Sequence, residues 1–145
     1  MKNISLPIFS GLSWVIAATA QAADLYVSPD GNNTPPFANW AQAARNIQAA
    51  VDAASGGDTI YLADHTYLLK ETITVDKAIT IKGFSGPDNC VVDGRNNVRC
   101  FDINDASLVD LTIQRGFVRG EGLGDPVRKY GGGVYARNCV ISNCV

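Results

Sequence analysis

The side chains best suited to chemistry are charged residues concentrated between positions 93 and 115. Four are carboxylates and three are guanidinium groups: Asp93, Asp102, Asp105, Asp110, Arg95, Arg99 and Arg115. Carboxylate oxygens are preferred ligands of Ca²⁺, and an arginine beside them could serve as a base towards an acidic substrate. Alternation along the surrounding strands directs all seven outward or into loops. A solvated surface with aspartates in its turns explains the same pattern, so we name no catalytic, cofactor-binding or metal-ligating residue.

Four cysteines form a second group with potential chemistry: Cys90, Cys100, Cys139 and Cys144. They lack the CxxC spacing of a zinc site, and the single histidine lies far upstream. Strand alternation points Cys90 and Cys139 inward and Cys100 outward. We expect buried thiols, although export would permit disulfides, and a Cys90–Cys100 bridge would need a twist in the segment between them.

Two further features have purely structural explanations. The glycine-rich "GEGLGDP" (120–126) has neither the strand-to-helix context nor the Lys-Ser/Thr of a phosphate loop, and it occurs once. It predicts a long loop between structural repeats, running from Val118 to Tyr130, where function is often placed. Phe101, Tyr61 and Tyr135 could stack against sugars, but alternation places Phe101 inside.

Residues 1–22 predict a secretory signal. A short positive start precedes an apolar stretch broken by Pro7 and Gly11, and Ala20-Gln21-Ala22 is a small-x-small cleavage pattern. A membrane anchor would need about 20 apolar residues, so we expect no membrane span in the mature chain. Cleavage would leave 11 basic and 14 acidic residues, a balance that argues against nucleic acid as a partner.

The elements that position these residues begin with one helix. After a strand at 25–27 and a turn-rich loop, apolar residues recur with helical spacing from Trp40 to Ala54. Asn39 is the expected N-cap, and Gly56-Gly57 the expected stop. Residues 23–57 are therefore predicted as a strand, a loop and a capping helix.

From Asp58 onward the apolar period changes to two, which is typical of short strands. The expected strands lie at 59–63, 72–75, 78–83, 90–94, 99–103, 108–114, 133–136 and 139–142. Windows of about thirty residues align Ile79 with Leu111 and Cys139, Ile81 with Ile113 and Ile141, and Phe101 and Ile103 with Val134 and Ala136. Such repeats predict a parallel β-solenoid over 58–145, with each turn stacked on the previous one. A β-sandwich with an Asp93-Gly94 hairpin explains fewer residues.

Several segments carry a family resemblance. "LYVSPDGNN", "NIQAAVDAASGGDTIYLADHTY", "KAITIKGFSGPDNCVVDG" and "GGGVYARNCVISNC" resemble the N-terminal part of secreted bacterial proteins with right-handed parallel β-helix repeats, the pectin-lyase-like superfamily. The resemblance covers Asp24 to the end and implies an all-β right-handed parallel β-helix with an amphipathic capping helix, here represented by its first turns. His65 replaces the glycine usual before Thr-Tyr, and histidine tolerates the positive φ of such a turn.

The resemblance implies several functions, because this superfold hosts many. We expect an exported protein, secreted or at the cell surface in association with the outer membrane, that binds polysaccharide. A polysaccharide lyase or glycoside hydrolase with catalytic residues beyond Val145 is an alternative, although the paired aspartates beside Gly-His-Gly of the hydrolases are absent. An autotransporter-like adhesin is another. The last strand is expected to be uncapped, so self-association through that end is predicted.

Overall fold

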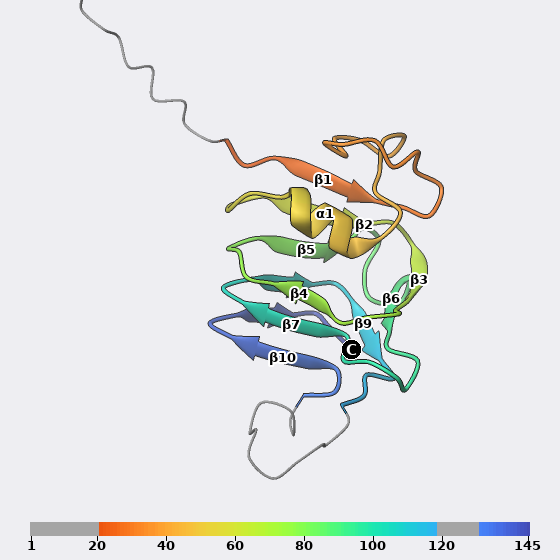
Figure 1. The fold of residues 1–145 in the computed structure, drawn as a ribbon, viewed down its shortest axis with the longest axis vertical. Helices are drawn as coiled ribbons and strands as arrows, with labels where there is room; N and C mark the ends of the chain where they lie inside the picture. The colour runs from red at the N-terminus through yellow and green to blue at the C-terminus, as the bar shows by residue number, and fades with distance from the viewer. Residues whose placement is uncertain (1–20, 119–130) are drawn as a thin grey trace, which may run out of the picture.

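The computed structural model describes residues 21–118 and 131–145, and within them the chain coils into a stack of parallel strands. Figure 1 shows β1 at one end of the stack and β10 at the other. Three sheets make up its sides. Sheet A contains β1 (Asp24–Val27), β2 (Thr59–Leu62), β5 (Thr80–Gly83), β8 (Ser107–Val109) and β11 (Val140–Ser142). Sheet B contains β3 (His65–Leu68), β6 (Cys90–Asp93) and β9 (Thr112–Gln114), and sheet C contains β4 (Ile73–Val75), β7 (Phe101–Asn104) and β10 (Val134–Arg137).

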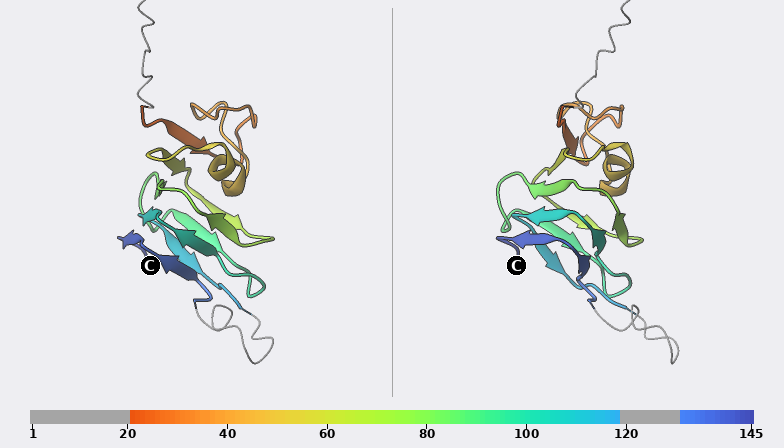
Figure 2. Two further views of the ribbon diagram at one scale, coloured as in Figure 1. Left: turned by 60° about the vertical axis from the view of Figure 1, so that its left-hand side comes forward. Right: turned by 90° about the vertical axis from the view of Figure 1, so that its left-hand side faces the viewer.

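Every pair of neighbouring strands in these sheets is parallel, which confirms the predicted parallel β-helix and rules out the sandwich. Successive turns are stacked in tiers when the molecule is seen from the side (Figure 2). No helix among the described residues is long and apolar enough to cross a bilayer.

The core consists of columns of aliphatic side chains that point inward from the same position in successive turns. In sheet A the column is Leu25, Ile60, Ile81, Leu108 and Ile141. Its first four members are at most 4% exposed. Strands about 4.8 Å apart bring these side chains into direct contact, and burial of each one stabilises the stack by about 2 kcal/mol.

The predicted register is correct for one column and wrong for two. Phe101 and Ile103 stack against Val134 and Ala136 as expected. Ile81 and Ile141, however, lie above and below Leu108 rather than Ile113. The same shift places Ile79 and Cys139 level with Ala106 rather than with Leu111. The segment 108–114, expected to be one strand, is two, β8 and β9, because Asp110 adopts a positive φ of 57° and turns the chain between sheets.

Left-handed backbone conformations recur at the corners between sheets. Asp105 and Asn138 have φ of 60° and 50° after sheet C, while Asp110 and Asn143 have φ of 57° and 48° after sheet A. Aspartate and asparagine adopt this conformation at least cost after glycine, which explains why they punctuate the strands. His65 does not share it: it opens β3, a strand that we did not predict, and pairs with Cys90.

The helix α1 (Ile47–Ala53) is shorter than predicted. Its N-cap is Asn46, whose side chain accepts a hydrogen bond from the Ala49 backbone N–H, rather than Asn39. Ala44 is instead bridged to Val27 at the end of β1, which holds the preceding residues in non-helical backbone. Tertiary pairing thus overrides the helical periodicity of residues 40–45.

Helix α1 lies on the same side of the stack as β4, β7 and β10 (Figure 1) and covers the free edge of β4. The Gln48 side-chain amide accepts from the Thr74 N–H at 2.9 Å and donates to the Thr74 C=O at 3.2 Å. Lys77 Nζ donates to the carbonyls of Val51, Asp52 and Ala54 at the end of the helix. These bonds satisfy a strand edge and a helix end at once, confirming the capping role.

The four cysteines are free thiols. Cys90 and Cys100 are completely buried, while Cys139 and Cys144 are half-buried against the core. The prediction that Cys100 faces outward is therefore wrong. It precedes β7, where the chain turns the corner from sheet B, and its Sγ lies 3.4 Å from the Gln114 carbonyl oxygen. Strand alternation does not extend through such a corner.

We expect Cys90 and Cys100 to resist alkylation in the folded protein. Burial raises the pKa of Cys90 to about 12 and that of Cys100 to about 11, so both remain protonated at pH 8. Timed alkylation followed by peptide mass spectrometry should label Cys139 and Cys144 first and the buried pair only after denaturation. Equal labelling of all four under native conditions would contradict this burial.

The edge formed by β10 and β11 has no neighbouring strand among the described residues, and it leaves apolar side chains uncovered. Val140 is 61% and Ile141 46% exposed. When residues 23–145 are produced alone, we expect concentration-dependent self-association through this edge. Val140→Lys should shift light-scattering masses towards the monomer, while Leu68→Lys, equally exposed but distant from this edge, should not. A wild-type monomer at all concentrations would refute the expectation.

Candidate functional site

The outer face of sheet C carries a group of interacting charged and aromatic side chains. Strand pairing aligns Thr74, Asp102 and Tyr135 in one outward column across β4, β7 and β10. Their inward neighbours Phe101 and Ile103 are completely buried, which fixes the direction of the outward set. The candidate site is therefore positioned by the same alternation that builds the core.

Two arginines flank this column. Arg99 Nη1 lies 3.4 Å from Asp102 Oδ2, and Arg137 Nη2 lies 3.9 Å from Asp102 Oδ1. The guanidinium carbons lie 5.1 Å and 5.4 Å from the centre of the Tyr135 ring, respectively, within the range of cation–π attraction. Arg99 also donates to the Gly131 carbonyl at 3.0 Å. We call Arg99, Asp102, Tyr135 and Arg137 the arginine–tyrosine cluster.

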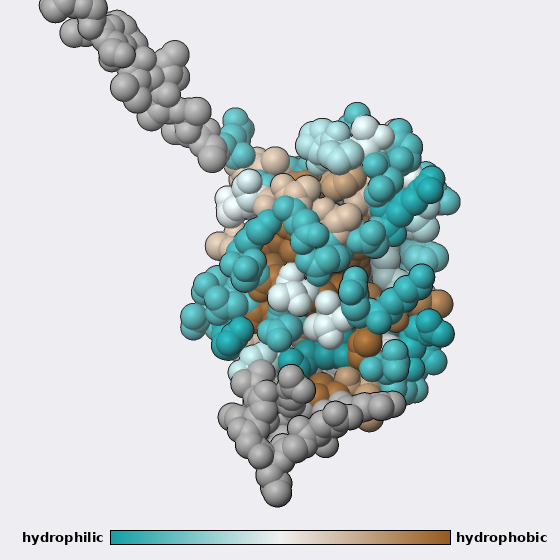
Figure 3. Space-filling model, in the orientation of Figure 1, coloured by the Kyte–Doolittle hydropathy of each residue, from teal (hydrophilic) through white to brown (hydrophobic). Residues whose placement is uncertain are grey.

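An open groove of about 360 Å³ adjoins the cluster. Its lining residues are Thr72, Thr74, Asn97, Val98, Arg99, Asp102, Phe117 and Val118. The surface over α1, β4, β7 and β10 is largely hydrophilic with patches of apolar surface between (Figure 3). The groove thus offers hydroxyl, amide, charged and aromatic groups along one side of the coil.

The cluster has the composition of an anion-binding surface. The Arg137 guanidinium is the accessible cation of this cluster, because its side chain is 58% exposed whereas that of Arg99 is 10% exposed. Guanidinium groups bind carboxylates through paired N–H donors, and an adjacent ring can pack against the apolar part of a ligand. The arrangement can therefore bind an acidic ligand.

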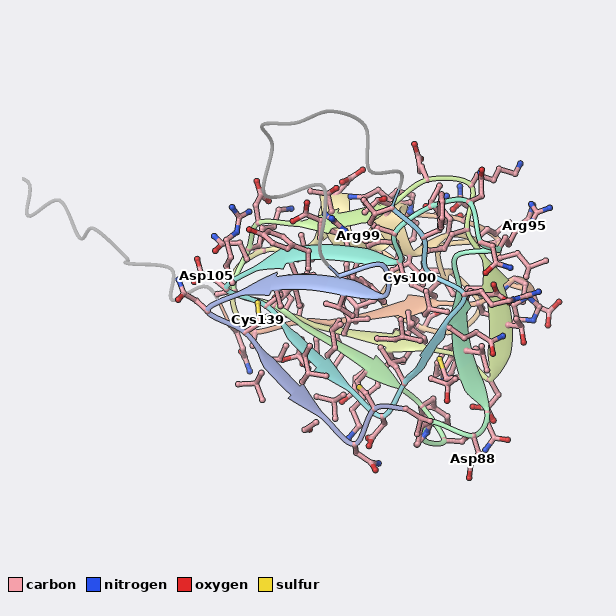
Figure 4. The ribbon with its side chains drawn as sticks, turned by 90° about the horizontal axis from the view of Figure 1, so that it is seen from below. Asp88, Arg95, Arg99, Cys100, Asp105 and Cys139 are labelled. Carbon is pink, nitrogen blue, oxygen red and sulfur yellow. The ribbon has the colours of Figure 1, made fainter. Side chains whose placement is uncertain are left out.

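The structure does not bring the seven predicted charged residues into one groove. Arg99 and Asp102 meet on sheet C, and Asp93, Arg95 and Arg115 meet at the end of β6, whereas Asp105 and Asp110 lie at two other corners of the cross-section. Figure 4 shows Asp105 and Arg95 at different corners, with Arg99 on the side between them. Asp110 lies at a third corner, where it pairs with Lys82 at 3.5 Å and accepts from Asn143. No three acidic, histidine or cysteine side chains converge on a metal-sized site within residues 21–118 and 131–145.

Asp93 was expected to face outward, yet it is completely buried at the end of β6. Its carboxylate accepts from Arg115 Nε at 2.9 and 3.0 Å and from Arg115 Nη2, and also from the Gln114 side chain and the Arg95 backbone N–H. The alternation fails here because the chain bends out of sheet B. The Arg115 hydrogen bonds hold the pKa of Asp93 below its usual value despite burial, which opposes them.

Sequence reasoning missed Arg137 and left the orientation of Tyr135 open. The alternation of β10 carried the signal, because Val134 and Ala136 were assigned inward and Tyr135 and Arg137 share the opposite parity. The predicted signal at 1–22 and the loop 118–130 fall mostly outside the described residues.

Comparison with known proteins gives one partial similarity. The chain is 37% identical over 90 residues to a protein of Emericella nidulans named pectate lyase PEL9, an alignment that covers 56% of this chain and 22% of that protein. The chain thus spans about a fifth of this relative's length. No protein-family profile and no solved structure matches. The similarity agrees with a pectin-lyase-like parallel β-helix and a role related to polysaccharide.

Replacing Asp93 should destabilise the fold more than replacing a surface aspartate. Asp93→Asn replaces the charged acceptor of Arg115, Gln114 and the Arg95 N–H by a neutral amide, and it should lower the free energy of unfolding by about 2 kcal/mol. Asp105→Asn is the matched control, because Asp105 is exposed at a positive φ that asparagine adopts equally well. Urea denaturation at pH 7 measures both variants.

The same carboxylate predicts a pH dependence. Because folding lowers the pKa of Asp93, its stabilising contribution is complete above the ordinary aspartate pKa of about 4 and is lost as the pH falls through the lower folded value. The stability difference between wild type and Asp93→Asn should therefore shrink in acid. A difference that stays constant from pH 7 to pH 3 would refute the role of the ionised carboxylate.

Proposed function

We propose that this chain belongs to an exported parallel β-helix protein that binds an acidic polysaccharide, such as pectate, through the arginine–tyrosine cluster of sheet C. The cluster is the observation that carries the proposal. A uronate chain presents one carboxylate on each sugar, and Arg137, whose side chain is 58% exposed, offers guanidinium donors beside the Tyr135 ring. The partial similarity to a protein named pectate lyase supports the same ligand class.

The coil favours a long ligand over a small one. The groove is open and extends along β4 and β7 to the segment around Phe117. The lining groups come from different turns of one rigid stack, so their spacing is set before the ligand arrives, which reduces the entropic cost of binding. Export, through the signal predicted at 1–22, would bring this surface to extracellular polysaccharide.

A polysaccharide lyase is the second candidate function, and the name of the relative favours it. The described residues do not gather the acidic groups that a calcium-assisted elimination would use. In this alternative the catalytic groups belong to other parts of the protein, and sheet C contributes a subsite for the sugar chain. Formation of unsaturated uronide product from polygalacturonate would demonstrate the lyase.

Binding to polygalacturonate tests the proposal. Arg137→Gln should weaken binding by about tenfold in affinity electrophoresis, and added salt should weaken wild type more than the variant, because one charge contact is lost. Arg95→Gln removes the same charge from an exposed corner, where Arg95 interacts only through its backbone N–H, which donates to Asp93. This variant should bind polygalacturonate as tightly as wild type. An equal loss of affinity in both variants would show that binding depends only on the overall charge of the protein, and it would refute the site.

A further inference from the structure

The outer face of sheet A carries an aromatic cluster that neither the core nor the arginine–tyrosine cluster uses. Tyr26 of β1 and Tyr61 of β2 are paired in register, and their rings stack 5.7 Å apart with an interplanar angle of 24°. Trp40 packs edge-on against Tyr26 at 4.6 Å, and Phe84 packs against Trp40 at 5.1 Å. We call these four residues the aromatic platform.

The platform is partly exposed to solvent. Phe84 is 58% exposed, and the other three rings are half-buried. Exposing a phenylalanine ring to water is unfavourable, and a ligand that covered Phe84 would remove this cost. Among residues 21–118 and 131–145 no group hydrogen-bonds to the Tyr26 or Tyr61 hydroxyl, so both hydroxyls can donate to a ligand and accept from it.

The backbone around Trp40 is fixed before any ligand binds. The Tyr26 N–H donates to Phe37, and the Ala44 N–H donates back to Tyr26, so the loop is hydrogen-bonded to β1 on both sides of Trp40. Gly31 lies so close to Ala43 that an added Cβ would come within 2.2 Å of the Ala43 carbonyl oxygen. A rigid loop presenting a ring loses little entropy on binding.

One charged residue, Lys82, continues the same outward column, which then passes through Val109 and Ser142. Strand pairing places Lys82 directly after Tyr61, and Lys82 is 40% exposed beside Asp110. Asn143 donates to that carboxylate from the next turn. Lys82 and the corner formed by Asp110 and Asn143 therefore place hydrogen-bonding side chains beyond the aromatic rings, an arrangement that matches a sugar chain with apolar ring faces and hydroxyl edges.

We infer that the aromatic platform is a second polysaccharide-binding surface, which holds pyranose rings by stacking rather than by charge. The C–H faces of a pyranose pack on aromatic rings, while the tyrosine hydroxyls and Lys82 reach its hydroxyl groups. The inference goes beyond the proposed function, on which it rests only for the class of ligand. Because the platform and the arginine–tyrosine cluster belong to different sheets, the two surfaces can be disabled separately.

Highly methyl-esterified pectin, which lacks most of the carboxylates, is the probe that separates stacking from charge. In the full chain carrying Trp14→Phe, Trp40 is the remaining tryptophan, so its emission reports on the platform. Titration with this pectin should change the Trp40 emission. Phe84→Ala should weaken binding about fivefold, and Tyr61→Ala should act in the same direction.

Two controls decide the outcome. Leu68→Ala removes an apolar side chain that is 57% exposed outside the platform, and Arg137→Gln disables the other surface; both should bind esterified pectin as wild type does. Unchanged Trp40 emission on binding, or wild-type affinity in Phe84→Ala, would overturn the inference. If the protein binds polygalacturonate but not esterified pectin, the platform is refuted and the proposed function stands. If it binds both polymers, and binding depends on Phe84 but not on Arg137, the platform stands and the proposed site on sheet C is refuted.

Discussion

Parallel pairing in register places each residue of one turn directly over its counterpart in the next, and both the core and the surfaces follow from this constraint. Inward positions become columns of aliphatic side chains such as Ile60, Ile81 and Leu108, whose mutual burial supplies the main stabilisation. Outward positions become columns as well. Residues far apart in sequence therefore lie side by side on one face because their strands are paired, without a loop positioning them.

The same constraint creates edges that must be satisfied. At β4 the Gln48 amide substitutes for a missing strand by bonding to both backbone groups of Thr74, and Lys77 returns three hydrogen bonds to the end of the helix. This reciprocal capping shows why a helix of seven residues suffices. The helix does not stabilise the stack mainly by its own propensity but by closing a sheet that would otherwise expose donors and acceptors.

The two candidate binding surfaces use the outward columns in different ways. On sheet C, two arginines share one aspartate and a tyrosine ring, so the attraction depends on charge and weakens with salt. On sheet A, aromatic rings stack along the coil axis, and the attraction depends on apolar contact. A polysaccharide with both carboxylates and apolar ring faces has the chemistry to engage each of them.

The sequence by itself determined the class of architecture, because a period of two recurring in windows of about thirty residues has few physical solutions other than a parallel coil. It also identified the Phe101–Val134 and Ile103–Ala136 stacking, since alternation within a single strand is reliable. Only the tertiary structure decided what happens where strands end. The positive φ of Asp110 splits one apolar segment between two sheets, the pairing of Ala44 with β1 shortens the helix, and the corners turn Asp93 and Cys100 inward. Periodicity predicts the direction of side chains along a strand but contains no information about the bends between strands. The register of the middle turn, and the residues that make up the two candidate surfaces, depend on those bends and could not be predicted from the sequence.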